Sequence, residues 1–196
     1  MWRELLSELE KIDCYIPEKI EGSEKKLRLN SNENLFVPKD LLKRIAARAL
    51  RRSDIRFYPS QAIYEKLTGR IAEYLDLDEE NIIIDNGSDM LIDKVLMALS
   101  RVGGKVAAVE PTFPMYRIRS SVFGAPYVPI RTDEDFELDV HEVVRKSYDV
   151  SAMFICRPNN PTGKVFPEGQ VLDILEHTSC VLILDCLLYT SPSPRD

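Results

Sequence analysis

The chain has 196 residues, of which 44% are hydrophobic and 30% are charged, which is enough for one domain with a hydrophobic core. Its 32 acidic residues exceed its 26 basic residues, and the formal net charge of −6 argues against a nucleic-acid partner or an anionic membrane surface. No apolar run is long enough to span a bilayer, and the first residues do not resemble a signal peptide. The four cysteines lack metal-ligand spacing, so we expect reduced cysteines, no metal site and a cytoplasmic protein.

Helical and strand patterns alternate along the chain. Apolar residues recur at helical spacing within residues 1–30, which we expect to form an N-terminal helix and arm. Amphipathic stretches then alternate with short apolar runs. In chain order the sequence predicts a helix after Pro38, a helix through Ile63 and Tyr74, a strand at 81–85, a helix through Leu91 and Leu99, a strand at 105–109, a helix through Tyr116, a strand at 127–130, a helix from Asp139, a strand at 152–155, a helix through Val171 and Leu175, and a strand at 181–185.

This alternation predicts an α/β fold with a mostly parallel sheet and helices on both faces. Nearly continuous apolar strands are typical of a sheet that is buried on both sides. We expect residues 31–185 to form this large domain. Residues 186–196 contain two Ser-Pro steps without periodicity and resemble translated sequencing adapter, so we expect a non-native tail, with a natural disordered tail as the alternative.

The segment Asn-Asn-Pro-Thr-Gly at residues 159–163 follows the predicted strand at 152–155. It therefore leaves the carboxyl end of a strand, which is the edge where open α/β sheets bind ligands. Pro161 and Gly163 fix a turn and hold the amide of Asn160 in one direction. The alternative is a strand-to-helix turn without chemistry.

Three further loops carry groups that suit a phosphorylated ring. Gly87, Ser88 and Asp89 open a helix whose N–H groups and hydroxyl suit a phosphate, although a plain cap by Ser88 or Asp89 is the alternative. Phe113 suits stacking on a planar ring or a place in the core. Asp185 ends an apolar strand and needs a cationic partner, such as a protonated pyridine nitrogen. Together with the amide at position 160, these groups describe a site for pyridoxal 5′-phosphate.

The order and spacing of these loops resemble the class I and II (fold type I) pyridoxal-phosphate aminotransferases. Within that family the chain most resembles the histidinol-phosphate aminotransferases. The matching stretches lie at residues 31–34, 56–59, 86–89, 110–113, 115–116, 133–136 and 159–163.

The resemblance implies a role for each matching residue. Ser88 and the neighbouring amides would bind the cofactor phosphate, and Phe113 would stack on the pyridine ring. Asn160 would bond the phenolic oxygen of the ring, and Asp185 would pair with its nitrogen. Tyr58 would reach the phosphate bound by the partner subunit of a homodimer.

Asn32 would lie near the substrate entrance, although loop anchoring is the alternative for both Asn32 and Tyr58. The family's Schiff-base lysine, its arginine for the substrate carboxylate and its small C-terminal domain have no counterpart in this chain. We therefore expect no catalytic residue here and an inactive fragment of an aminotransferase.

The resemblance implies transfer of an amino group between glutamate and a phosphorylated imidazole ketone in histidine biosynthesis. The partners would be small amino-acid and keto substrates. A threonine-phosphate decarboxylase and an aromatic aminotransferase are alternatives within the superfamily. A non-catalytic module that binds a phosphate ligand or dimerises is a third alternative. A nucleotide-binding protein lacks support, because neither a glycine-rich dinucleotide fingerprint nor a P-loop lysine motif is present.

Overall fold

The computed structural model describes residues 36–186 together with Ser7, Glu10 and Ile12. Most of the predicted N-terminal helix and arm, Asn32, and residues 187–196 lie outside the described residues. The chain divides into two compact units, whose described parts are essentially residues 36–84 and residues 85–186. The predicted divisions near residues 30 and 185 stay predictions.

The unit of residues 36–84 is helical. Helix α2 spans Lys39–Arg52 and begins directly after Pro38, as predicted. Helix α3 spans Gln61–Leu75 and is followed by the short 3-10 helix η2 at Glu79–Asn81. Among these elements only Ala72 is buried, so the described chain leaves the apolar faces of α2 and α3 exposed.

The unit of residues 85–186 contains one parallel sheet of four strands. Its strand order is β2-β1-β3-β4, and every pair is parallel. The predicted α/β fold with a parallel sheet is confirmed. The elements are α4 (Ser88–Arg101), β1 (Val106–Glu110), α5 (Met115–Phe123), β2 (Tyr127–Arg131), α6 (Val140–Ser147), β3 (Ala152–Cys156), α7 (Glu168–His177) and β4 (Val181–Asp185).

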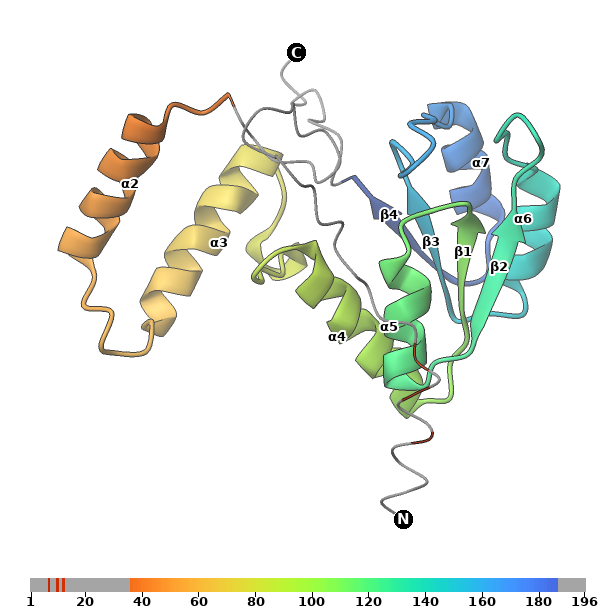
Figure 1. Cartoon of the computed structure of the whole chain (residues 1–196), viewed down its shortest axis with the longest axis horizontal. Coiled ribbons are helices and arrows are strands. Elements are labelled where there is room, and N and C mark those ends of the chain that lie inside the picture. The colour runs from red at the N-terminus through yellow and green to blue at the C-terminus, as the bar shows by residue number, and fades with distance from the viewer. Residues whose placement is uncertain (1–6, 8–9, 11, 13–35, 187–196) are drawn as a thin grey trace. The chain divides into compact units, whose positions relative to one another are not determined.

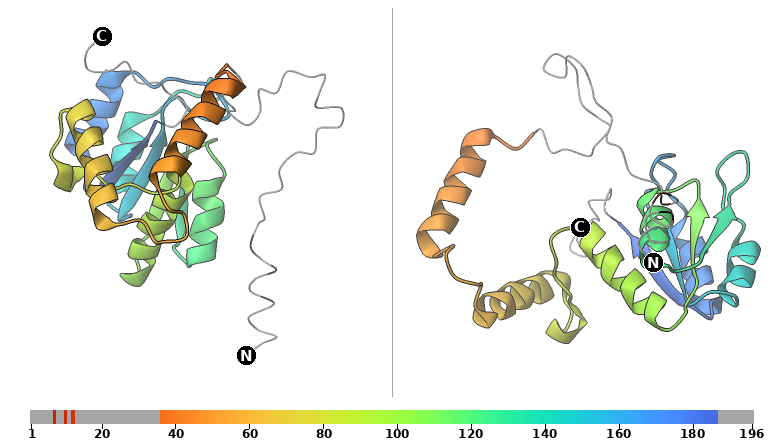
Figure 2. Two further views of the ribbon diagram at one scale, coloured as in Figure 1. Left: turned by 90° about the vertical axis from the view of Figure 1, so that its left-hand side faces the viewer. Right: turned by 60° about the horizontal axis from the view of Figure 1, so that its bottom comes forward.

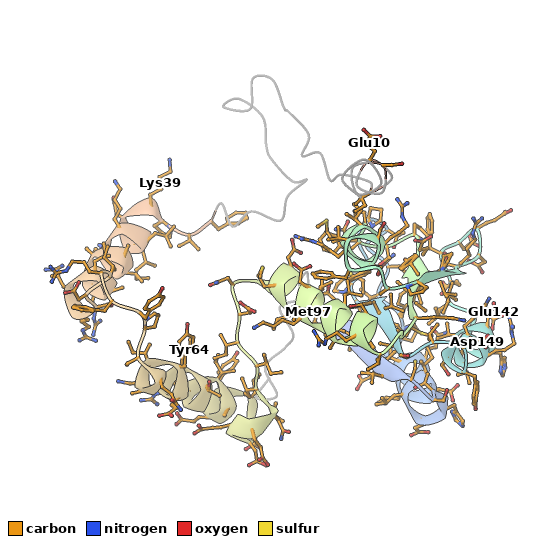
Figure 3. The ribbon with its side chains drawn as sticks, turned by 90° about the horizontal axis from the view of Figure 1, so that it is seen from below. Glu10, Lys39, Tyr64, Met97, Glu142 and Asp149 are labelled. Atoms are coloured by element: carbon orange, nitrogen blue, oxygen red, sulfur yellow. The ribbon has the colours of Figure 1, made fainter. Side chains whose placement is uncertain are left out.

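Helices cover both faces of this sheet. Figure 1 and Figure 2 show α4 and α5 on one face and α6 and α7 on the other. In Figure 3, Met97 on α4 and Glu142 on α6 lie on opposite sides of the strands. The predicted placement of helices on both faces is therefore confirmed.

The core follows the period of two in the strands. Val106 and Ala108 of β1 pack with α4 and α5, whereas Ala107 and Val109 pack with α6 and α7. The central strands β1 and β3 are buried along almost their whole length, which explains their unbroken apolar sequence. The edge strand β4 is less buried, and Val181 is 63% exposed.

The predicted strand at residues 81–85 is wrong. Ile82 has extended dihedral angles, but the segment around it forms no strand, and Ile83 is 74% exposed. A strand requires the backbone groups of a neighbouring strand, and within residues 36–186 no strand runs beside this segment. The apolar run therefore indicated the local conformation but not a pairing partner.

The strand order reverses direction between β1 and β3. The connection from β1 to β2 runs through α5 on one face, and the connection from β3 to β4 runs through α7 on the opposite face. The loops that leave β1 and β3 therefore lie at the reversal point, at the carboxyl ends of the strands, which is where open α/β sheets form their ligand crevice.

Candidate functional site

Asn159 joins the two loops that border this crevice. It is 2% exposed, and its side chain donates to the Pro111 carbonyl at 2.7 Å and to Thr162 Oγ1 at 2.9 Å. It also accepts a hydrogen bond from Thr112 Oγ1 at 3.0 Å. The loop after β1 and the loop after β3 are thus held together by one buried amide.

Asn160, the next residue, has a different environment. It is half-buried. Within the described chain its side-chain amide makes no hydrogen bond, whereas Asn159 uses both of its polar atoms. The loop therefore anchors itself through Asn159 and leaves the amide of Asn160 for another partner.

Asp185 ends β4 at the same edge of the sheet, and it pairs in register with Cys156 of β3. The hydroxyl of Tyr116, on α5, donates to Asp185 Oδ2 at 2.6 Å. The neighbour that we expected for this carboxylate was a cation, and the structure adds a neutral phenol from the helix that follows β1. Burial, first of all, and the nearby carboxylate raise the pKa of Tyr116 far above its ordinary value, so the hydroxyl remains a donor.

Phe113 belongs to an aromatic cluster with Tyr116 and Phe154. Its ring meets the ring of Tyr116 edge-on, with 5.7 Å between centroids. Tyr116 in turn stacks on Phe154 with 4.5 Å between centroids. Phe113 is itself only half-buried at the margin of the core, so its position is compatible with both expectations, a stacking platform and a core residue.

The N-terminus of α4 lies at the same end of the sheet. Figure 1 shows α4 and β1 running in opposite directions, so α4 begins toward the end of the sheet at which β1 ends. Gly87 is the N-cap residue, with φ of 87° and ψ of 166°, a conformation that is essentially restricted to glycine. The N-cap position is taken by Gly87 and no side chain among the described residues caps this helix, so the alternative of a cap by Ser88 or Asp89 is wrong. The N–H groups of the first turn remain suited to an anion.

An ion pair offsets the acidic charge beside this helix terminus. Lys94 Nζ lies 2.5 Å from Asp85 Oδ2. This contact, through hydrogen bonding above all, lowers the pKa of Asp85. The carboxylate of Asp85 is therefore neutralised locally, which reduces its repulsion of an anion at the helix N-terminus.

Two predicted site residues lie outside the described part of the unit that contains the sheet. Tyr58 belongs to the unit of residues 36–84, and its side chain is 98% exposed. Asn32 lies outside the described residues. Within the part of the chain that the structure describes, no helix is sufficiently long and apolar to cross a membrane, and no cluster of His, Cys, Asp and Glu forms a candidate metal site.

Residues 24–186 match the model of the aminotransferase class I and II family. The chain belongs to this family. It is similar to a histidinol-phosphate aminotransferase of Thermoanaerobacter sp. (strain X514), with 31% identity over 161 residues that cover 81% of this chain and 45% of the relative. The chain therefore spans about half the length of the curated relatives that it matches.

Solved structures show the same fold. The histidinol-phosphate aminotransferase of Clostridium acetobutylicum aligns with a TM-score of 0.62 and 24% identity, covering 75% of this chain and 42% of that chain. An L-threonine-O-3-phosphate decarboxylase of Porphyromonas gingivalis aligns with a TM-score of 0.59 and 22% identity, covering 76% of this chain and 44% of that chain. At these identities the two structures support the fold alone.

Sequence reasoning missed the contributions of Asn159 and Tyr116. Tyr116 lies three residues after Phe113 on the face of α5 that meets the sheet, and this helical spacing was the available signal. Asn159 gave no signal, because neither its burial nor its contacts with residues 111 and 112 follow from its neighbours in sequence.

Proposed function

We propose that this chain carries part of the pyridoxal 5′-phosphate site of an aminotransferase that acts on histidinol phosphate. The whole protein would transfer an amino group between glutamate and the phosphorylated imidazole ketone in histidine biosynthesis. The supporting observation is that Asp185 ends β4 in register with Cys156, the last residue of β3, so this carboxylate and the loop that carries Asn160 lie at the carboxyl end of the sheet. Among the described residues the side chain of Asn160 has no hydrogen bond, and no side chain caps the N-terminus of α4.

These residues fit the chemistry of the cofactor. The helix N-terminus at Ser88 suits a phosphate dianion, because its free N–H groups and the helix dipole both favour negative charge. A carboxylate at the end of β4 suits a protonated ring nitrogen. The amide of Asn160 suits an oxygen on the ring, and the half-buried Phe113 suits its aromatic face.

When bound, the cofactor ring takes up the electron pair that remains on the substrate carbon after its proton is removed. The residues of this chain would prepare for that role without moving a proton themselves. Asp185 would keep the ring nitrogen protonated, and Asn160 would orient the ring within its plane. The α4 N-terminus would hold the phosphate and so fix the ring's position in the crevice.

Binding of pyridoxamine 5′-phosphate tests this proposal directly, since that form of the cofactor needs no covalent bond to a lysine. We expect saturable one-to-one binding in calorimetry, with competition by inorganic phosphate. Asp185→Ala should weaken binding at least tenfold. Asp173→Ala is the matched control, because it removes an exposed carboxylate on α7. The absence of binding, or equal binding by Asp185→Ala, would refute the proposal.

We also propose a homodimer in the cytoplasm. In the class I and II family a residue in the position of Tyr58 would serve the partner subunit, and the 98% exposure of this side chain is compatible with that use. The free cysteines Cys156, Cys180 and Cys186 fit a reducing compartment. Analytical ultracentrifugation of the whole protein and cell fractionation test the two statements, and a monomer or a membrane-bound fraction would contradict them.

The second candidate is a decarboxylase of a phosphorylated amino acid, which is the alternative that the sequence resemblance leaves open. A substrate panel on the whole protein separates the two activities. Preference for histidinol phosphate over phenylalanine and threonine phosphate supports the transaminase. Release of carbon dioxide from threonine phosphate would favour the decarboxylase.

A non-catalytic module that only binds a phosphate ligand is the third candidate, favoured by the anion-binding geometry of α4 alone. It predicts that inorganic phosphate binds as tightly as pyridoxamine 5′-phosphate. It also predicts that Asp185→Ala leaves both affinities unchanged.

A further inference from the structure

We infer that Tyr116 is a positioning residue that fixes the Asp185 carboxylate and the Phe113 ring together. This inference rests on the proposed function, because both of these residues would face the cofactor ring. Asp185 would lie beside the ring nitrogen and Phe113 against the ring face, and the inference is that the one buried side chain of Tyr116 aligns them with each other.

The burial of Tyr116 makes it rigid. The side chain is fully buried, and its ring stacks on Phe154 of the central strand β3 with an interplanar angle of 9°. Its backbone lies in the first turn of α5, and its carbonyl accepts a hydrogen bond from the buried Ser120 hydroxyl at 2.6 Å. A hydroxyl on such a ring has little freedom, so it can define the position of its acceptor.

The hydroxyl orients Asp185 across the sheet. Its bond to Asp185 Oδ2 is 2.6 Å long and connects residues that are 69 positions apart in sequence. A hydrogen bond to a carboxylate stabilises the ionised form and limits its rotation. Both effects keep the Asp185 carboxylate ionised and in place, so the proton stays on the cationic partner of Asp185 and is not shared with the carboxylate.

The ring of Tyr116 acts on Phe113 at the same time. The edge-on contact of 5.7 Å between centroids, with an interplanar angle of 83°, is a favourable aromatic arrangement. Phe113 is half-buried at the margin of the core, so this contact restricts its ring. Movement of Tyr116 would thus disturb both groups together.

Tyr116→Phe tests the inference, because it removes the hydroxyl and keeps the ring on Phe154. The matched control is Tyr127→Phe, which removes another partly buried hydroxyl that donates to a carboxylate, Glu110 Oε1 at 2.8 Å. The readouts on the whole chain are the Kd for pyridoxamine 5′-phosphate and the pH at which the bound ring nitrogen loses its proton, followed by ultraviolet absorption. The unfolding midpoint in urea is measured alongside.

We expect Tyr116→Phe to weaken binding about tenfold, in line with the strength of a hydrogen bond to a charged group. The bound ring nitrogen should lose its proton at a lower pH than in the unmodified chain. Tyr127→Phe should match the unmodified chain in both readouts. With Asp185→Asn already in place, Tyr116→Phe should change Kd less than about twofold, since the charged acceptor is gone.

Equal Kd and equal ring titration in Tyr116→Phe and the unmodified chain would overturn the inference and leave the proposed function standing. Loss of affinity that is as large in the Asp185→Asn background would also overturn it, because the hydroxyl would then not act through Asp185. No binding by the unmodified chain would refute the proposed function and the inference with it. If Tyr116→Phe does not fold, the inference is tested on the unmodified chain by NMR of the tyrosine hydroxyl protons. The hydroxyl signal of Tyr116 should shift when pyridoxamine 5′-phosphate binds, and the hydroxyl signal of Tyr127 should not. An unmoved Tyr116 signal would overturn the inference.

Discussion

Replacing Asn159 with alanine removes three hydrogen bonds from the crevice at once. The side chain is 2% exposed and bonds the Pro111 carbonyl, Thr112 Oγ1 and Thr162 Oγ1 at distances of 2.7, 3.0 and 2.9 Å. The bonds to Pro111 and Thr112 are the only side-chain hydrogen bonds between the loop after β1 and the loop after β3 that the described residues show, and the bond to Thr162 lies within the loop after β3. Their loss should therefore loosen both loops.

The expected cost follows from these bonds. A hydrogen bond adds about 0.5–1.5 kcal/mol net to stability, so three bonds amount to about 3 kcal/mol of the free energy of unfolding. The threonine partners are only half-buried and can turn toward water, so the penalty for unbonded groups adds little. With a urea m-value of about 1–3 kcal/mol per molar, the unfolding midpoint should fall by about 1–3 M.

Asn160→Ala is the matched control, because the two asparagines are neighbours and, among the described residues, only the side chain of Asn159 hydrogen-bonds the protein. Asn160→Ala should stay within about 0.5 kcal/mol of the unmodified chain in stability. It should nevertheless weaken the binding of pyridoxamine 5′-phosphate. Urea unfolding followed by circular dichroism measures the first effect and calorimetry the second. An unchanged midpoint in Asn159→Ala, or an equal loss of stability in Asn160→Ala, would refute this division of roles.

Three further predictions concern single positions. Gly87→Ala should cost about 1–3 kcal/mol of unfolding free energy, because alanine is strained at a φ of 87°. A steric clash does not contribute, since an added Cβ meets no atom within 4 Å. Gly169→Ala, in helix α7 with similar open space, should be neutral or stabilising in the same urea assay. Phe154→Ala should cost about 3–5 kcal/mol, because the ring is fully buried against Tyr116, and a smaller loss would contradict the packing. A hydrogen bond with the Asp173 carbonyl raises the pKa of His177, so its NMR titration midpoint should lie above about 6.5. The stability that this bond contributes should be complete below that pH and be lost as the pH rises through the raised pKa, and His177→Gln should abolish this dependence.

The local sequence was sufficient for most of the elements and for the loops that carry chemistry. Unbroken apolar runs predicted β1 and β3, because strands buried on both faces have no polar side to alternate with. The Gly-Ser-Asp and Asn-Asn-Pro-Thr-Gly segments predicted the positions of the α4 N-terminus and the loop after β3. Such signals are local, since they depend on dihedral preferences and on burial averaged over a few residues.

Only the tertiary structure decided which groups meet. Asp185 and Tyr116 are 69 residues apart, and nothing near either residue in sequence indicates the other. The strand order β2-β1-β3-β4 brings the ends of β1, β3 and β4 to one edge, and this order determines which loops share the crevice. The extended segment at residues 81–85 shows the reverse case, because a strand depends on a partner that the segment itself does not encode. Contacts between residues that are distant in sequence follow from the packing of the whole sheet, so the residues adjacent in sequence do not predict them.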